Sequence, residues 1–205
     1  MVDDTSNSSP DFDFYENCVY GKQNQMSFPS GGKRVKHILE LVHSDVFGPV
    51  KVPSLGKYVY YVSFIDEFSR NTWIYFLKKK SKVFDRFKEF KALVENQTEK
   101  KIKVLRTDND GEFCSKEFEE ICKKCGIARQ KTTLYAPEKN GVAEIMNKTL
   151  MERARIMLSG VGLGQEFWAE EVETTCYLVN RSPSRVKLDA CLHVFCCFNH
   201  QILVI

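Results

Sequence analysis

The sequence has no run of about 18 apolar residues, and no basic segment followed by an apolar one at its N-terminus. It therefore offers no candidate membrane span and no secretory signal, and we expect an intracellular protein. Internal repeats are also absent. The chain has 205 residues, of which 43% are hydrophobic, so it can form one sizeable globular domain.

Dense, evenly spaced cysteines are missing too, although the chain contains eight. We therefore predict reduced thiols rather than a disulfide framework. Residues 1–21 hold five acids and no Lys or Arg, whereas residues 78–106 hold eleven basic residues and four acids. This basic segment suits a polyanionic partner, and a solvated helix face is the alternative for any single lysine in it.

Composition and hydrophobic periodicity divide the chain into four parts. We predict a disordered leader over 1–14, a linking segment over 15–32, a folded core over 33–185 and a divergent tail over 186–205. In the core we expect strands at 38–46, 58–65, 72–77, 102–107 and 127–132, and helices at 81–98, 115–125, 141–158 and 165–180, with Ser81 capping the first helix. This order predicts an α/β fold, a five-stranded mixed sheet with helices on both faces.

Three carboxylates occupy positions where acids are seldom merely solvated. Asp45 lies inside an apolar strand, Asp108 ends another strand, and Glu144 falls in the first turn of a helix. If the three converge, their repulsion favours a divalent cation, and oxygen ligands suit magnesium or manganese. The alternative for each aspartate is a simple turn, at Gly48-Pro49 for Asp45 and at residues 108–111 for Asp108.

Three motifs carry a resemblance to a known family. They are His43-Ser44-Asp45-Val46-Phe47-Gly48-Pro49, Leu105-Arg106-Thr107-Asp108-Asn109-Asp110-Gly111-Glu112-Phe113 and Pro137-Glu138-Lys139-Asn140-Gly141-Val142-Ala143-Glu144. With 35 residues between Asp108 and Glu144, they resemble the catalytic blocks of the integrase core of copia-type long-terminal-repeat retrotransposons, part of a Pol polyprotein.

The resemblance implies a ribonuclease-H-like fold and a metal-binding catalytic triad of Asp45, Asp108 and Glu144. It implies that Asp45 bridges two Mg²⁺ or Mn²⁺ ions while Asp108 and Glu144 hold one each. The implied reaction is processing of the 3′ ends of the element's DNA, followed by their transfer into target DNA. A homo-oligomer acting on DNA in the nucleus, with no membrane partner, follows from the same resemblance.

Three further residues are candidates for DNA binding. Lys148 and Arg155 share the predicted helix face of Glu144, as does Met151, so the two cations could grip phosphates beside the site. The alternative for Lys148 is an ordinary i,i+4 pair with Glu144. Asn140, in the loop before that helix, is the third candidate.

The chain departs from the family pattern at several positions. Cys18 stands where the last ligand of the preceding zinc module is expected, but Tyr15 replaces the other cysteine and no His precedes it, so we expect no zinc site there. Asp110 replaces a usual glycine and Ile145 a usual arginine. The tail has zinc-like spacing, but we interpret it as accidental; its candidate ligands are His193, Cys196, Cys197 and His200.

Two other functions remain open from the sequence. A decayed or co-opted remnant would keep the fold and bind nucleic acid without catalysis, which the incomplete zinc module and the unusual tail favour. A ribonuclease H would cleave RNA–DNA hybrids with a different acidic set. The intact set of Asp45, Asp108 and Glu144 favours the integrase hypothesis over both.

Overall fold

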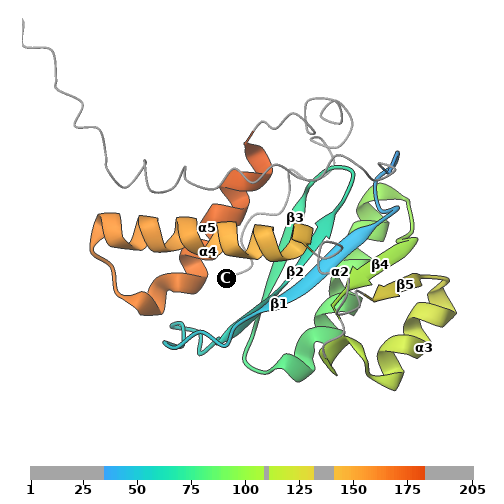
Figure 1. Cartoon of the computed structure of the whole chain (residues 1–205), viewed down its shortest axis with the longest axis horizontal. Helices are drawn as coiled ribbons and strands as arrows, with labels where there is room; N and C mark the ends of the chain where they lie inside the picture. The colour runs from blue at the N-terminus through green and yellow to red at the C-terminus, as the bar shows by residue number, and fades with distance from the viewer. Residues whose placement is uncertain (1–34, 109–110, 132–140, 183–205) are drawn as a thin grey trace, which may run out of the picture.

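The structure, a computed structural model, describes residues 35–108, 111–131 and 141–182 (Figure 1). The predicted leader, the 15–32 segment and the 186–205 tail lie outside these residues. The described strands are β1 (Val42–Phe47), β2 (Tyr60–Asp66), β3 (Thr72–Leu77), β4 (Val104–Thr107) and β5 (Ala128–Lys131). The helices are α2 (Val83–Thr98), α3 (Lys116–Cys125), α4 (Gly141–Val161) and α5 (Trp168–Arg181), with 3₁₀ turns at Lys80–Lys82, Gly111–Phe113 and Gln165–Phe167.

The five strands form one mixed sheet in the order β3-β2-β1-β4-β5. The β1–β2 and β2–β3 pairs are antiparallel, and β1–β4 and β4–β5 are parallel. The strands β1, β2 and β3 form an antiparallel meander. The chain then passes through α2 to β4 and through α3 to β5, because strands that join the sheet in parallel need a long connection. The predicted five-stranded mixed sheet with helices on both faces is therefore confirmed.

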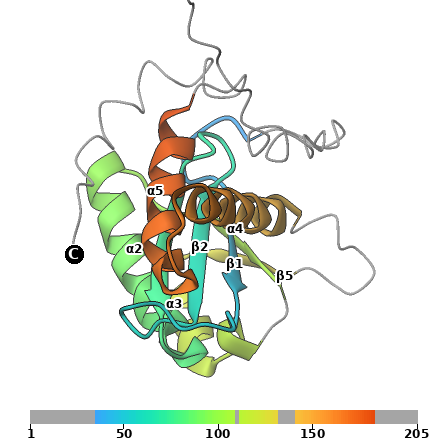
Figure 2. The same ribbon diagram turned by 90° about the vertical axis from the view of Figure 1, so that its left-hand side faces the viewer.

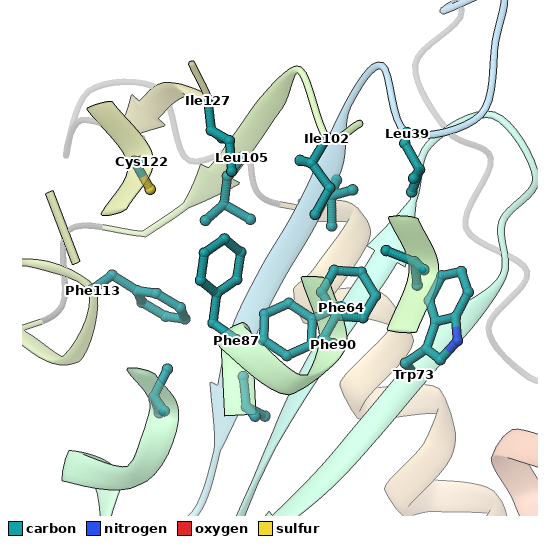
Figure 3. Packing of buried hydrophobic residues seen from close by; sticks show 14 of the residues in the cluster. Leu39, Phe64, Trp73, Phe87, Phe90, Ile102, Leu105, Phe113, Cys122 and Ile127 are labelled. Carbon is teal, nitrogen blue, oxygen red and sulfur yellow. The ribbon is translucent and has the colours of Figure 1, made fainter. Parts of the chain in front are cut away.

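One face of the sheet packs against α2 and α3 through an aromatic core (Figure 3). Phe64 of β2 stacks on Phe90 of α2 with ring centroids 4.3 Å apart, and Phe87 stacks on Phe118 of α3 at 4.8 Å. Trp73 meets the edge of the Phe90 ring at 5.3 Å. These contacts extend the core from β3 to α3.

The other face of the sheet packs against α4 and α5, which cross one another (Figures 1 and 2). Tyr61 of β2 is fully buried beneath α4 and stacks on Phe47, and Trp168 of α5 meets the edge of Phe76. Because both faces are covered here, β2 is buried along almost its whole length. None of the helices in the described residues is long and apolar enough to span a membrane.

Most predicted boundaries hold within a few residues, and one capping prediction is wrong. Ser81 lies inside the 3₁₀ turn, so α2 begins at Val83 with Lys82 as N-cap and no side-chain cap. The first strand begins at Val42 rather than residue 38. By contrast, Ser115 caps α3 by accepting from the Phe118 N–H, and Gly126 ends that helix with φ 70°.

The last turn of α5 is tied to the edge of the sheet. The Asn180 side chain accepts a hydrogen bond from the Thr72 N–H at 2.9 Å and donates one to the Thr72 carbonyl at 2.7 Å. Thr72 begins β3, which is an edge strand. The Asn180 amide thus takes the place of a neighbouring strand at this position.

We predict that Phe64→Ala lowers the free energy of unfolding by about 3 to 5 kcal/mol, because it empties the centre of the aromatic core. Urea unfolding monitored by circular dichroism measures this change. Tyr177→Ala is the matched control, since Tyr177 is 48% exposed and contacts Arg181 on the surface. A loss for Phe64→Ala no larger than that of the control would contradict this account of the core.

Candidate functional site

The parallel pairing of β1 and β4 brings the chain segments of the two candidate aspartates together. His43 pairs with Arg106 in this ladder, and Asp108 directly follows Thr107, the last residue of β4. Asp45 points to the face that carries α4, because its carboxylate accepts a hydrogen bond from Asn147 of that helix. Both aspartates are half-buried. If the register and alternation of β4 continue to Asp108, its carboxylate lies beside Asp45 on the same face.

A buried polar link connects Asp45 to α4. Asn147 is 1% exposed, and its side-chain Nδ2 donates to Asp45 Oδ2 at 2.9 Å. The backbone carbonyl of Asn147 accepts a hydrogen bond from the Tyr61 hydroxyl at 3.1 Å. Burial, together with the nearby charge of Asp45, raises the pKa of Tyr61 well above its usual value, so the hydroxyl remains a donor. This network fixes one oxygen of Asp45 and the position of α4 together.

Glu144 lies one helical turn before Asn147, on the exposed side of α4. It therefore projects from the helix that touches Asp45. Within residues 35–108, 111–131 and 141–182, no three His, Cys, Asp or Glu side chains are arranged to hold a metal ion. The structure thus places the end of β4, just before Asp108, next to the strand of Asp45, and Glu144 on the helix that contacts Asp45, without closing the three into one cluster.

Two residues before Asp45, the buried His43 of β1 contacts an ion pair formed by Glu67 and Arg70. His43 is 0% exposed, and its Nε2 lies 2.7 Å from Glu67 Oε2, while Arg70 donates to the other Glu67 oxygen at 2.8 Å. Burial lowers the pKa of His43, against the opposing effect of Glu67. Burial acts to raise the pKa of Glu67, but the His43 hydrogen bond and the Arg70 charge outweigh it, so this pKa is lowered. His43 is therefore a neutral imidazole whose Nε2–H donates to the Glu67 carboxylate.

The predicted DNA-binding residues have different positions. Lys148 and Arg155 are exposed on α4, and Lys148 Nζ lies 3.9 Å from Glu152, further along the helix than the predicted partner Glu144. Met151 is 4% exposed and packs in the core beneath α4, so it does not share their open surface. Asn140, like Asp110 and the tail residues His193 and Cys196, falls outside the described residues.

Most of the basic segment is neutralised by local ion pairs. Within the described residues, six of its cations lie within 3.2 Å of an acid: Lys80–Glu112, Lys82–Asp85, Arg86–Glu89, Lys88–Asp85, Lys91–Glu95 and Lys103–Glu40. Moreover, α2 covers the sheet face opposite Asp45. These six side chains are already paired with acids, so they offer little unpaired positive charge to a polyanion.

Asn147 is the site residue that the sequence interpretation missed. It lies three residues after Glu144, but its side chain is buried against the sheet whereas Glu144 is exposed. A buried asparagine and an exposed one have the same sequence signal. The only clue was a polar residue among the apolar positions of the helix, where Leu150 and Ala154 are buried.

Comparisons with known proteins agree with this geometry. Residues 36–137 match the family described as "Integrase core domain". The chain is 50% identical over 167 residues, 82% of its length, to the retrovirus-related Pol polyprotein from transposon TNT 1-94 of Nicotiana tabacum. It is 33% identical over 87% of its length to the Pol polyprotein from transposon RE1 of Arabidopsis thaliana. It spans only 13% and 12% of these two polyproteins.

The fold is also similar to a solved structure. A chain in the simian T-cell lymphotropic virus intasome, solved in complex with the PP2A regulatory subunit B56 gamma, superimposes with a TM-score of 0.59 at 18% identity. The match covers 80% of this chain and 57% of that one. Together with the strand order, it confirms the predicted ribonuclease-H-like α/β fold.

The buried His43 predicts a pH-dependent stability. Since its folded pKa lies below the ordinary 6.5, the unfolded chain binds a proton more readily, and stability falls as pH drops below about 6.5. We expect His43→Gln to have a flatter Tm profile between about pH 7 and 5.5 than the wild type. Thermal unfolding followed by fluorescence measures it. His37→Gln, at an exposed histidine, should keep the wild-type slope; equal slopes in all three proteins would refute the prediction.

Proposed function

Because this chain carries the integrase core of a copia-type retrotransposon Pol polyprotein, we propose that it binds DNA and catalyses metal-dependent 3′-end processing and strand transfer. Its family and fold are those of polynucleotidyl transferases. The observation that supports the proposal is the parallel pairing of the Asp45 strand with the strand that ends just before Asp108, beside the helix of Glu144.

The donor set fits a divalent cation of the magnesium class. Asp45 and Asp108 would supply neighbouring carboxylates, and hard oxygen ligands are those that Mg²⁺ and Mn²⁺ prefer. Asp45 would hold both ions, Asp108 one and Glu144 the other. When bound, two such ions would supply charge neutralisation at the attacking and leaving oxygens of a phosphodiester.

Residues of the chain itself contribute orientation and charge. The Asn147 amide donates to Asp45 Oδ2, which holds that oxygen against α4. The exposed position of Glu144 leaves its carboxylate accessible to a substrate lying along α4. No side chain here is needed as a covalent nucleophile, because the DNA 3′ hydroxyl attacks the target phosphorus directly and the 3′ oxygen of the target bond leaves.

We place the DNA along the exposed surface of α4. Lys148 and Arg155 are exposed on the same helix as Glu144, Lys148 one turn and Arg155 about three turns further along, and each can neutralise a phosphate. Glu152 already pairs with Lys148, at 3.9 Å, so a phosphate would compete with that weak contact. Action on chromosomal DNA implies a nuclear protein, and joining two DNA ends implies a homo-oligomer.

The triad is tested by single substitutions in a strand-transfer or disintegration assay with Mg²⁺ or Mn²⁺. We expect Asp45→Asn, Asp108→Asn and Glu144→Gln each to lower the rate about a hundredfold or more, because each removes a charge that would hold an ion. The same aspartate variants should lose the rise in Tm that Mn²⁺ causes in the wild type.

Glu170→Gln is the matched control for these variants, since it removes an exposed carboxylate from α5, away from the aspartates and from the proposed DNA-binding residues. Its rate should equal the wild-type rate. Equal activity in the wild type and all three triad variants would exclude catalysis by Asp45, Asp108 and Glu144. It would favour the alternative, a nucleic-acid-binding remnant that keeps the fold.

Asn147 provides a second, more specific test as a positioning residue. We expect Asn147→Ala to lower activity about 10- to 100-fold through a weaker apparent affinity for Mn²⁺, because Asp45 loses the donor that orients it. The rate is measured against Mn²⁺ concentration. High Mn²⁺ should restore part of the activity, whereas a defect that is independent of Mn²⁺ would assign Asn147 to folding alone.

A further inference from the structure

A hollow lies on the sheet face opposite the carboxylates, between α3 and β5. Its volume is about 210 Å³, and its lining residues are Glu119, Cys122, Lys123, Ile127, Arg129 and Lys131. Arg129 pairs with Leu105 in the β4–β5 ladder, so its side chain shares the face of the aromatic core. None of these residues has a role in the carboxylate site described above.

Arg129 has hydrogen-bonding capacity that the fold does not use. Its Nε and Nη2 atoms are buried, and neither donates a hydrogen bond to an acceptor within the described part of the chain. Its guanidinium lies over the Phe118 ring, 5.0 Å from the centroid. These two nitrogens form the edge that binds a pair of phosphate or carboxylate oxygens, and leaving such donors unpaired is costly.

The charge around the hollow is positive. Lys123, Arg129 and Lys131 contribute three cations, and Glu119 is the one acid among the lining residues. Lys123 lies 3.0 Å from Glu119, and its hydrogen bond, with weaker effects of Lys131 and Arg129, lowers the pKa of that carboxyl. A single carboxylate therefore faces three cations, so an anion can enter without displacing Glu119.

The floor of the hollow is apolar. Cys122 and Ile127 close the end of the aromatic core next to Leu105 (Figure 3). Burial raises the pKa of the Cys122 thiol, so the floor supplies no negative charge of its own to neutralise Arg129. An anion that pairs with the unused Arg129 donors must therefore come from outside this pocket. An apolar floor next to cations suits a sugar–phosphate unit.

We propose that this hollow binds a phosphate group of a nucleic-acid strand, with the Arg129 fork on two phosphate oxygens and Lys123 and Lys131 on the rim. This inference rests on the proposed DNA-binding function and adds a second contact surface, remote from the carboxylates. Binding turns the guanidinium from above Phe118 into the hollow. The exposed Lys123 and Lys131 reach the neighbouring phosphates of the same strand.

The test measures binding of a short fluorescent DNA duplex to the full chain by anisotropy, over a series of salt concentrations. We expect Arg129→Gln to weaken binding about tenfold and to reduce the slope of log K against log salt by about one, because one phosphate contact is lost. Lys131→Gln, at an exposed position, should reduce the slope in the same direction.

Arg86→Gln is the matched control, since it removes the same charge from a half-buried arginine of α2 paired with Glu89. Its affinity and slope should equal those of the wild type. If Arg129→Gln and Lys131→Gln also match the wild type, the proposal is wrong. Circular dichroism of each variant shows whether it remains folded.

Nuclear magnetic resonance separates the possible sources of the phosphate. The Arg129 Nε–H signal should shift saturably with the duplex at concentrations where inorganic phosphate and a mononucleotide leave it unchanged. A shift with the small anions alone would overturn the nucleic-acid assignment. Loss of strand transfer in the triad variants tests the catalytic proposal separately, because those variants should keep the Arg129-dependent duplex binding.

Discussion

The parallel register between β1 and β4 is the constraint on which the candidate site depends. It places the end of β4, from which Asp108 follows, beside the strand of Asp45, because both strands run in one direction and His43 is paired with Arg106. A slip of one residue would turn one of the two side chains to the opposite face, against α2. The two packed faces oppose such a slip, since each strand has apolar side chains on one or both of them. Core packing and site geometry are therefore specified by the same alternation.

Much of the fold could be predicted from the sequence, because its signals are local. Ser115 and Gly126 bound α3 as their residue types predict, and the apolar run of β2 reflects burial on both faces. The Ser81 cap was wrong because a 3₁₀ turn precedes α2 and takes the serine into its interior. Such a turn has no strong sequence signature of its own.

The site was less accessible to sequence reasoning, since its polar contacts join distant segments. The hydrogen bond from Asn147 to Asp45 spans 102 residues, and no local pattern announces it. The basic segment illustrates the opposite error. Its lysines and arginines are dense in the sequence, yet acids at helical spacing neutralise several of them, as Asp85 does for Lys82 and Lys88. Local charge density is therefore a poor guide to where a polyanion binds, and unpaired donors such as those of Arg129 are more informative.

The contact between Asn180 and Thr72 sets a lower limit on the length of a fragment of this domain that can fold by itself. Every candidate catalytic carboxylate precedes residue 145, so a fragment ending soon after α4 would retain all three. Such a fragment would nevertheless leave the first residue of β3 with an unsatisfied N–H and carbonyl, and the edge strand open to pairing with another chain. The smallest folding unit is consequently longer than the smallest set of catalytic residues, and α5 acts as the closing element of the sheet.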